Sequence, residues 1–368
     1  MEFRIAAEEL RKALYRAQGI VERKTTMPIL ANVLLNATKT GVQVTAFDLD
    51  VGIVSEHSGE VLKPGGLTVS AKYLFDIVQS VPEQQVTLKK LPNNYLELHS
   101  GTAHFKLVGT AAEEYPKLPK EENAPLVGLN GATLLEMIRK TSFAISSDET
   151  RYILNGVFFE PRQQGKTRMV ATDGHRLALV ERELAGDFKL KSGVIIPRKG
   201  LFELKRLLDE APEAECHLGF AENSALFKKQ GLTMVMRLID GQFPEYQRVI
   251  PQEAERTITL GRSKFLDALR RISLLSVDKS NAVKVALAEN VVRITSSNPD
   301  LGEAKDDVEV SYKGSEITIG FNARYLIDVL SVIDGDEVAF ELSDEHSPGV
   351  LHLPGDRSYM AVVMPMRV

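Results

Sequence analysis

The sequence predicts an α+β protein made of three repeated domains, each with two helices packed on antiparallel β-sheets. Amphipathic segments, with apolar residues three and four positions apart, recur in each third of the 368-residue chain. Strand-like segments with turn residues separate them, and the order of elements is the same in each copy. The length agrees, because 368 residues exceed one ordinary domain core.

Each copy follows one plan. An amphipathic helix comes first, then a pair of strands with a turn near its middle, then a short apolar strand, a second helix and closing hairpins. The second helices begin near Ala71, Arg198 and Asn322. The first helices are predicted over 6–19, 130–146 and 261–276, and the strand pairs over 29–56, 153–181 and 282–310.

Two segments rich in proline and glutamate, 114–128 and 243–256, lack periodic patterns and are predicted to separate the copies. We therefore expect domains at 1–122, 128–250 and 256–368. The single cysteine, Cys216, excludes an internal disulfide, and no Cys/His cluster has the spacing of a structural zinc site. The sequence has neither a signal peptide nor a long apolar run, so we expect a cytoplasmic protein without membrane segments.

Charge is divided unevenly along the chain. The six predicted helices sum to +6, whereas the whole chain carries −5, so the remainder carries −11. Basic helices on an acidic body suit a polyanion, although ordinary solvated helix faces explain the charge equally well. No recognition-helix pattern or interleaved aromatic residues appear, so a duplex backbone is favoured over single strands if nucleic acid is bound.

Three motifs are weak signals for chemistry. PRQQGKT (161–167) ends like a phosphate-binding loop, but Glu160 stands where the first glycine is needed, so a hairpin turn is favoured. Asp48 and Asp50 lack a third metal ligand at sensible spacing, which favours an exposed strand end. His99 and His104 flank a Ser-Gly turn and are predicted to be hairpin surface rather than a metal pair.

TDGHRLA (172–178) and the C-terminal YMAVVMPMRV are the most unusual segments. His175 could act as a general base oriented by Asp173, but no serine or cysteine motif supplies a nucleophile. A turn-end histidine that contacts backbone or a partner is therefore favoured over a hydrolase. The tail stays apolar through Met364 and Met366, which suits an adaptable surface for several partners, while a last strand explains only Val362 and Val363.

RYILNGVFFE, VATDGHRLA, VIIPRKG, DGQFPEY, IGFNARYLIDVL and the terminal VVMPMR closely resemble the bacterial sliding clamps, the beta subunits of DNA polymerase III. The resemblance covers the full length. It implies three clamp domains per chain, a head-to-tail dimeric ring around duplex DNA, and no catalysis or cofactor. The implied partners are sequence-independent duplex DNA, the polymerase alpha subunit, the clamp loader and other clamp-motif proteins.

The resemblance also implies site residues. A pocket for partner peptides between the second and third domains would use Leu154, Thr172, Gly174, His175, Arg176, Leu177, Pro244, Arg248, Val249, Asn322, Tyr325, Val362, Val363, Met364, Pro365, Met366 and Arg367. The implied DNA contacts are Lys24, Lys72, Tyr152, Arg198, Lys199 and Arg206, with Arg11, Lys12 and Arg16 as additions from the helix pattern. The implied dimer contact pairs Phe105 and Leu107 with Leu274 and Leu275.

Departures from the family pattern affect details. Ser280 stands where a phenylalanine can line the pocket edge, and Asp148 and Ile153 replace more polar or uncharged contacts in the loop before Leu154. Two other functions are compatible with the residues alone, namely a hydrolase using His175 and an adaptor that binds peptides but not DNA.

Overall fold

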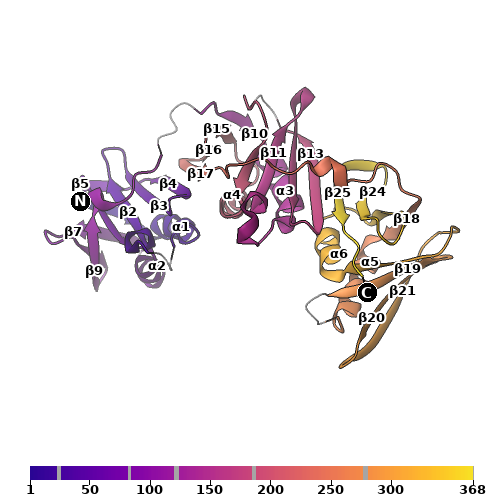
Figure 1. The fold of residues 1–368 in the computed structure, drawn as a ribbon. Coiled ribbons are helices and arrows are strands. Elements are labelled where there is room, and N and C mark those ends of the chain that lie inside the picture. The colour runs from indigo at the N-terminus through magenta and orange to yellow at the C-terminus, as the bar shows by residue number, and fades with distance from the viewer. Residues whose placement is uncertain (23–25, 82–83, 120–123, 185–187, 277–280, 368) are drawn as a thin grey trace. The chain divides into compact units, whose positions relative to one another are not determined.

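A computed structural model describes residues 1–22, 26–81, 84–119, 124–184, 188–276 and 281–367. Lys24 and Ser280 lie outside the described residues. The order of helices and strands repeats three times along the chain (Figure 1). This confirms the predicted α+β class and the predicted order of the helices.

Six α-helices of eight or more residues are described, two in each copy, and they begin where the apolar spacing predicts. The last predicted helix starts after Asn322, whose side chain accepts hydrogen bonds from the amides of Arg324 and Tyr325 and so caps the first turn. The first helices are α1 (Ala7–Gln18), α3 (Gly131–Thr141) and α5 (Arg262–Ser273), and the second are α2 (Ala71–Ser80), α4 (Arg198–Glu210) and α6 (Ala323–Leu330).

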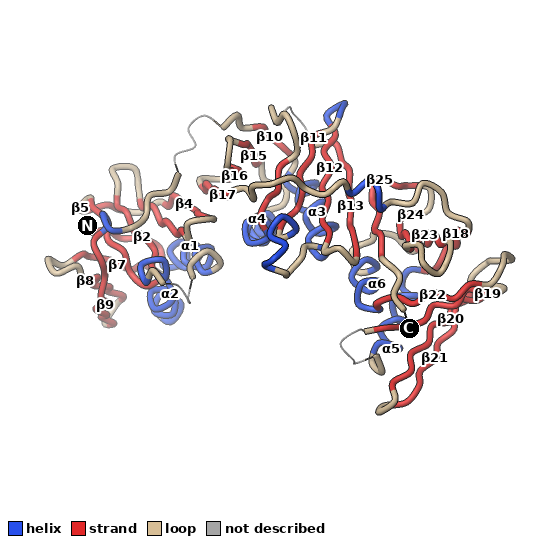
Figure 2. The backbone as a smooth tube through the Cα atoms, in the orientation of Figure 1, coloured by secondary structure: helices blue, strands red, loops and turns tan. Residues whose placement is uncertain are grey.

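Along the chain, the described strands and helices follow the same order in each copy, except that the first copy has one additional strand, β5 (Figure 2). The first copy holds β1 (Glu2–Ala6), β2 (Asn32–Ala37), β3 (Val42–Phe47), β4 (Val51–His57), β5 (Glu60–Lys63), β6 (Gly65–Ser70), β7 (Gln85–Lys90), β8 (Tyr95–Ser100) and β9 (Ala103–Ala111). The second holds β10 (Val127–Leu129), β11 (Gly156–Pro161), β12 (Lys166–Thr172), β13 (Arg176–Glu183), β14 (Val194–Pro197), β15 (Cys216–Phe220), β16 (Ser224–Lys229) and β17 (Leu232–Arg237). The third holds β18 (Arg256–Gly261), β19 (Ala282–Ala288), β20 (Val291–Asn298), β21 (Gly302–Glu309), β22 (Ile317–Asn322), β23 (Glu337–Leu342), β24 (Gly349–Leu353) and β25 (Asp356–Val363).

The predicted pair of strands after each first helix is wrong, because three strands occupy each of these segments. The cause is a second turn, centred on Asp48, Asp173 and Asn298, which lie 125 residues apart. In each turn one side-chain oxygen accepts the backbone amides two and three residues later. Asp48 therefore closes a turn at the end of β3, but its side chain is buried rather than exposed as predicted, whereas Asp50 is exposed.

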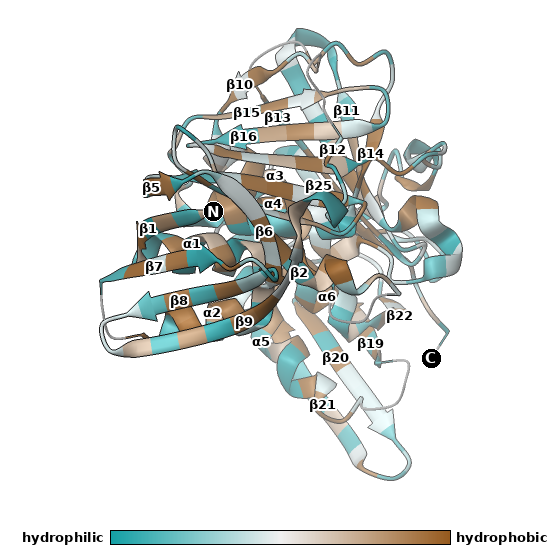
Figure 3. Ribbon diagram, turned by 90° about the vertical axis from the view of Figure 1, so that its left-hand side faces the viewer, coloured by the Kyte–Doolittle hydropathy of each residue, from teal (hydrophilic) through white to brown (hydrophobic). Residues whose placement is uncertain are grey.

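The described residues divide into two compact units. The first contains 1–132, 185–191 and 202–238 and is organised by one 13-stranded sheet. Helices α1 and α2 contact each other and pack on strands of this sheet, α1 on β3 and β4 and α2 on β2 and β6. Hydrophilic and hydrophobic residues intermingle along β7, β8 and β9 in Figure 3, as expected for strands with one buried face. The strand order is β10-β15-β16-β17-β4-β3-β2-β6-β9-β8-β7-β1-β5.

The second unit contains 133–184, 192–201 and 239–368 and is organised by two sheets. Helices α5 and α6 contact each other, with α5 against β20 and β21 and α6 against β22 and β25. The eight-stranded sheet has the order β14-β11-β12-β13-β25-β24-β23-β18, and the four-stranded sheet has the order β21-β20-β19-β22.

The two units do not follow the three copies, because strands of neighbouring copies pair within one sheet. We call the antiparallel pairing of β4 with β17 the first junction and that of β13 with β25 the second junction. Val51 faces Met236 at the first, and Arg176 faces Val363 at the second. No helix in the described residues has the combination of length and apolarity that a membrane crossing requires.

Candidate functional site

The TDGHR turn is held rigidly by its own side chains. Thr172 donates its hydroxyl to the carbonyl of Arg176 at 2.7 Å and accepts the amide of Gly174 at 3.1 Å. One oxygen of Asp173 accepts the amides of His175 and Arg176, and the other accepts Nε of Arg176 at 3.0 Å. Gly174 has a φ of +88°, a conformation that favours glycine. Local chemistry therefore fixes which way His175 and Arg176 leave the turn.

Arg176 is the central polar residue of the second junction. Its guanidinium donates to Asp328 Oδ2 and to the carbonyl of Phe143, each at 2.6 Å. It also lies 4.5 Å from the centre of the Tyr325 ring, and its side chain is only 11% exposed. A buried cation held by two carboxylates and a carbonyl ties β13 to α6 and to the segment after α3.

His175 has the surroundings of a contact residue rather than a base. Its ring is exposed and lies 6.5 Å from the Tyr325 ring, nearly parallel to it, and its carbonyl accepts the amide of Met364 at 2.9 Å. Both oxygens of Asp173 are already engaged by the turn and by Arg176. Asp173 is therefore not positioned to orient His175, and the geometry does not support the hydrolase interpretation.

The C-terminal tail lies beside this turn. Strand β25 ends with Val362 and Val363, which are almost fully buried, and the amide of Met366 donates to the carbonyl of Gly320 at 2.9 Å. Met364 is 37% exposed. The structure thus combines the two interpretations of the tail, because the valines complete a sheet and the residues from Met364 onward form surface.

An apolar pocket of about 170 Å³ opens between the turn, the tail and the segment before β18. Beneath it lies a core cluster that includes Val170, Leu179, Phe243 and Val350. The pocket floor is therefore rigid, while its rim carries Gly174, Glu245 and Met364, which are solvent-exposed. The lining residues are Leu154, Thr172, Gly174, Arg176, Leu177, Pro244, Glu245, Tyr246, Val249, Val362 and Met364.

Most residues predicted for the pocket from the resemblance come together here. Val363 does not line it, because neighbouring residues of a strand point to opposite faces and Val362 takes the pocket side. Arg248 is exposed and pairs with Glu245 at 2.5 Å, and Asn322 caps α6. Pro365, Met366 and Arg367 line a neighbouring hollow of about 540 Å³, together with Lys284 and His346.

Sequence reasoning missed Tyr246, which belongs to the quoted DGQFPEY segment. Its hydroxyl donates to Glu160 at 2.7 Å and accepts from Arg168 at 3.1 Å, and burial raises its pKa. Its partners come from β11 and β12, about 80 residues earlier. Only the fold brings them together, although an aromatic residue two positions after Pro244 was a visible signal.

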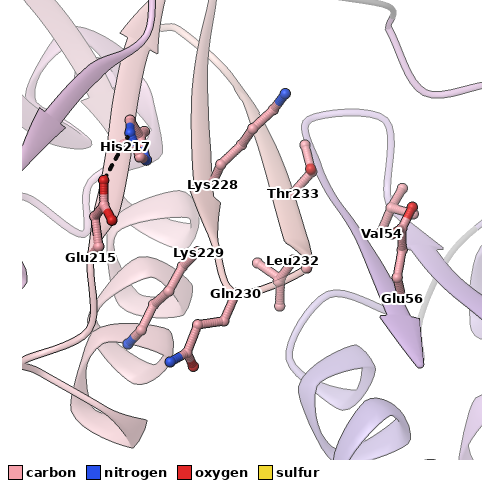
Figure 4. A pocket seen from close by; sticks show the side chains of 10 residues that line it. Val54, Glu56, Glu215, His217, Lys228, Lys229, Gln230, Leu232 and Thr233 are labelled. Carbon is pink, nitrogen blue, oxygen red and sulfur yellow. Dashed lines mark ion pairs between the residues drawn. The ribbon is translucent and has the colours of Figure 1, made fainter. Parts of the chain in front are cut away.

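A second hollow, of about 420 Å³, lies along the first junction and is polar (Figure 4). Figure 4 shows Lys228 and Thr233 across from Val54 and Glu56. Lys229 donates to the carbonyl of Leu207 at 2.7 Å, and burial lowers its pKa. With charges of both signs and few apolar groups, this hollow lacks the features that select a ligand.

The residues predicted to touch DNA are spread over both units and are mostly solvent-facing. Lys72 is exposed in the first turn of α2, Arg198 is exposed at the start of α4, and Tyr152 is 58% exposed. Arg11 and Lys12 are exposed on α1. Lys199 is half-buried in the first turn of α4.

Arg206, another predicted DNA contact, is engaged within its own unit. Its guanidinium donates to the carbonyls of Tyr15 and Arg16 at the end of α1, and to Glu203 at 2.5 Å. Arg16 is likewise paired, with Glu210 at 2.6 Å. Last-turn carbonyls of a helix attract cations, which accounts for the position of Arg206, whereas Arg16 forms an ion pair with a carboxylate.

The predicted dimer residues lie on exposed edges. Strand β9 pairs with β8 over 103–108 but meets β6 only from Gly109 onward, so this stretch has one described strand partner. Phe105 and Leu107 are half-buried on it. In the other unit, Leu274 is 72% exposed at the end of α5, and β21 is the edge strand of its sheet.

Comparison with known families matches the whole chain. Three models of the DNA polymerase III beta subunit match in order, the N-terminal domain at 1–119, the central domain at 128–245 and the C-terminal domain at 247–367. The chain belongs to the DNA polymerase III beta subunit family. This family comprises the sliding clamps, processivity factors rather than catalysts, and sliding-clamp function is therefore assigned to the chain.

Related sliding clamps agree over the full length. The beta sliding clamp of Vibrio cholerae is 36% identical over 370 residues and that of Caulobacter vibrioides over 373, with each chain covered completely. Among solved structures, the Caulobacter crescentus beta sliding clamp has a TM-score of 0.95 at 36% identity, covering all of both chains. The Bartonella birtlesii clamp bound to griselimycin has the same TM-score at 35% identity, also with complete coverage.

Proposed function

We propose that the apolar pocket of the second junction is the site where this sliding clamp binds its protein partners. The observation that carries the proposal is a small apolar pocket with a rigid floor, flanked by an exposed methionine and an exposed histidine. A cavity of about 170 Å³ has room for an anchoring side chain or two, not for a folded surface. Its occupants are short peptides of the polymerase alpha subunit, the clamp loader and other clamp-motif proteins.

Each part of the pocket has a task in this proposal. Leu177, Pro244 and Val362 bury the aliphatic or aromatic anchor of the peptide. Met364 adapts its shape to different anchors, because the thioether chain is unbranched and flexible. His175 and Arg248 are exposed at the rim and offer polar contacts that fix the register of the peptide.

The test is binding of a fluorescent clamp-motif peptide to matched variants of the full chain. Val249→Asp places a charge in the pocket, and Leu62→Asp places the same charge on β5; the two side chains are 45% and 46% exposed. We expect Val249→Asp to weaken binding by at least about 100-fold, which corresponds to roughly 3 kcal/mol for a charge in an apolar site, and Leu62→Asp to change nothing. Deleting Met364 to Val368 should also abolish binding. Unchanged affinity in the pocket variants would overturn the assignment.

We also propose that the clamp encircles duplex DNA without reading its sequence. Exposed Lys72, Arg198, Tyr152, Arg11 and Lys12 supply the contacts, together with half-buried Lys199. Phosphate contacts of this kind position a protein without specifying bases, which allows sliding. Retention on DNA circles compared with linearised DNA tests the topological link, since a ring slides off an open end. Equal retention on both forms contradicts encirclement.

The ring itself is proposed to be a head-to-tail dimer. The stretch of β9 with one described strand partner carries Lys106, whereas β21 carries four acidic residues and only one lysine, Lys305, so the two edges have complementary charge. Apolar Phe105 and Leu107 would meet Leu274 and Leu275 beside them. Leu274→Asp should convert the dimer to a monomer in sedimentation experiments, while Val249→Asp leaves it dimeric. A dimer that survives Leu274→Asp would exclude this interface.

The domain boundaries and the cellular compartment complete the proposal. We place the clamp domains at 1–122, 128–250 and 256–368, with the strand pairings of the two junctions crossing these boundaries. The protein is proposed to act in the cytoplasm, where a replication clamp meets bacterial DNA. Fractionation of cells with an antibody against the native chain tests the location.

A further inference from the structure

The hairpin of β8 and β9 gathers three side chains that the sequence separates. Glu97 and His99 are two residues apart on β8 and so share one face, and His104 on β9 is the direct cross-strand partner of His99. Gly101, with a φ of +56°, forms the tight connection between the strands. The Ser-Gly turn therefore does more than expose two histidines, because its register places both of them next to one carboxylate.

The three side chains already converge on one point. Glu97 lies 3.3 Å from Nε2 of His99 and 3.0 Å from Nε2 of His104, one carboxylate oxygen facing each ring. The ring centres are 4.4 Å apart. One donor atom from each residue lies within 4.8 Å of the other two. Ligands about 2.1 Å from a tetrahedral zinc ion lie roughly 3.4 Å from one another, so small side-chain rotations close the site.

Charged neighbours define what the site can accept. Lys106 and Lys89 stand opposite Glu97 on the two adjacent strands, and the ammonium of Lys106 lies 4.6 Å from the centre of the Tyr95 ring. With one carboxylate and two lysines nearby, calcium and magnesium lack the oxygen ligands that they require. Imidazole nitrogen instead suits zinc and its late first-row neighbours.

We propose that Glu97, His99 and His104 form a binding site for a divalent late transition metal, with zinc as its natural occupant. Two imidazole nitrogens and one carboxylate oxygen supply three ligands, and water completes the tetrahedron. In the single chain the side chains of His99 and His104 are 48% and 50% exposed, and His104 lies on the stretch of β9 that the ring proposal places at the dimer contact. The site is separate from the partner pocket and does not depend on the peptide proposal.

Titration of the untagged, metal-free full chain with cobalt and with zinc tests the site. We expect the visible absorption of tetrahedral cobalt to rise to one equivalent per chain and to vanish when zinc displaces the cobalt. His104→Ala and His99→Ala should each weaken zinc binding by at least about tenfold, since each removes a direct ligand. Glu97→Gln should also weaken it.

The matched control is His217→Asn. His217 is likewise an exposed-face histidine near one glutamate, Glu215, at 3.5 Å, but it has no second histidine beside it. This variant should bind cobalt as the parent chain does. Circular dichroism melts without metal verify that every variant is folded. Absence of the cobalt band in the parent chain, or an undiminished band in the His99 and His104 variants, would overturn the proposal.

Discussion

The two junctions begin from the same local design and end with different surfaces. An Asx turn precedes β4 and β13, and the neighbouring strand then donates one more backbone amide to the turn, Arg237 to Asp50 and Met364 to His175. At the first junction Leu118 packs directly on Gly52, because a Cβ at that glycine would lie 2.8 Å from the leucine side chain. At the second, Leu177 lines an open apolar pocket.

This difference shows how the same pairing of strands between copies can form either a filled core or an open binding site. The segments EYPKLP and PEYQRVIP both follow a copy's last strands, and Leu118 and Val249 occupy comparable places three residues after Tyr115 and Tyr246. Leu118 is half-buried over its own sheet, whereas Val249 is 45% exposed at the pocket. The first junction supplies its own apolar side chain, and the second leaves that place for a partner.

The largest loss of stability is expected when Arg176 is replaced. At the equivalent position of the first junction, three residues after the turn aspartate, the chain has apolar Val51. Arg176→Met leaves Asp173 and Asp328 without their buried cation and should lower the free energy of unfolding by about 3 kcal/mol. Urea unfolding of the full chain measures the loss. Arg248→Met is the control, because its side chain is 80% exposed and should change stability by less than about 0.5 kcal/mol. Similar losses in both variants would contradict the central role of Arg176.

The next prediction compares the free-energy cost of truncating Leu118 with that of truncating Val249. Leu118→Ala empties the space above Gly52 and should cost about 1–2 kcal/mol, less than a fully buried leucine because Leu118 is half-buried. Val249→Ala should cost less than about 0.5 kcal/mol, yet weaken clamp-motif peptide binding. Denaturation and peptide titration of both variants measure the contrast. A larger stability loss at Val249 than at Leu118 would reverse the interpretation.

Tyr115, which follows the last strands of the first copy, should make stability depend on pH. Burial raises the pKa of Tyr115 to about 12, and its hydroxyl accepts the Phe47 amide at 2.9 Å. The folded chain therefore keeps this proton where the unfolded chain loses it, so its contribution is complete below pH 10 and declines as pH rises from 10 to about 12. At about pH 11 the loss is about 1 kcal/mol.

Tyr115→Phe removes this titration and should flatten the alkaline decline in the free energy of unfolding. The substitution also lowers stability at neutral pH by removing a buried hydrogen bond, so the slope with pH rather than the absolute value is the measurement. An unaltered alkaline slope would mean that Tyr115 does not titrate in this range.

The smallest effect concerns the turns themselves. Leu49 has a φ of +85°, almost the same as the +88° of Gly174, although a leucine side chain disfavours this conformation. Leu49→Gly should therefore stabilise the chain by about 0.5 kcal/mol, while Gly174→Ala should destabilise it. At Gly174 an added Cβ would also lie 2.8 Å from Arg151. Thermal melts of the two variants and the parent chain measure the change in stability. Destabilisation by Leu49→Gly would contradict the strain argument.

Much of the fold was predictable because helix periodicity and element order are local properties of the chain. The six helices begin where apolar spacing and the starts at Ala71, Arg198 and Asn322 indicate. The three-strand segments were predicted as strand pairs because the Asx hydrogen bonds of Asp48 and Asn298 interrupt strands that look continuous in hydropathy, and the visible turn at Asp173 was not carried over to the other two copies. The charge of Arg206 was visible in the sequence, whereas its hydrogen bonds to the end of α1 were not, because they join residues about 190 positions apart.

The sequence by itself determined the repeat, the rigid TDGHR turn and the apolar tail, since each depends on side chains within a few residues of one another. Only the tertiary structure decided that β13 pairs with β25, which brings segments nearly 190 residues apart into one pocket. Tertiary structure likewise set the β8–β9 register that joins Glu97 to two histidines. The physical reason is that long-range pairing depends on which surfaces bury each other, and no short stretch of sequence contains both surfaces.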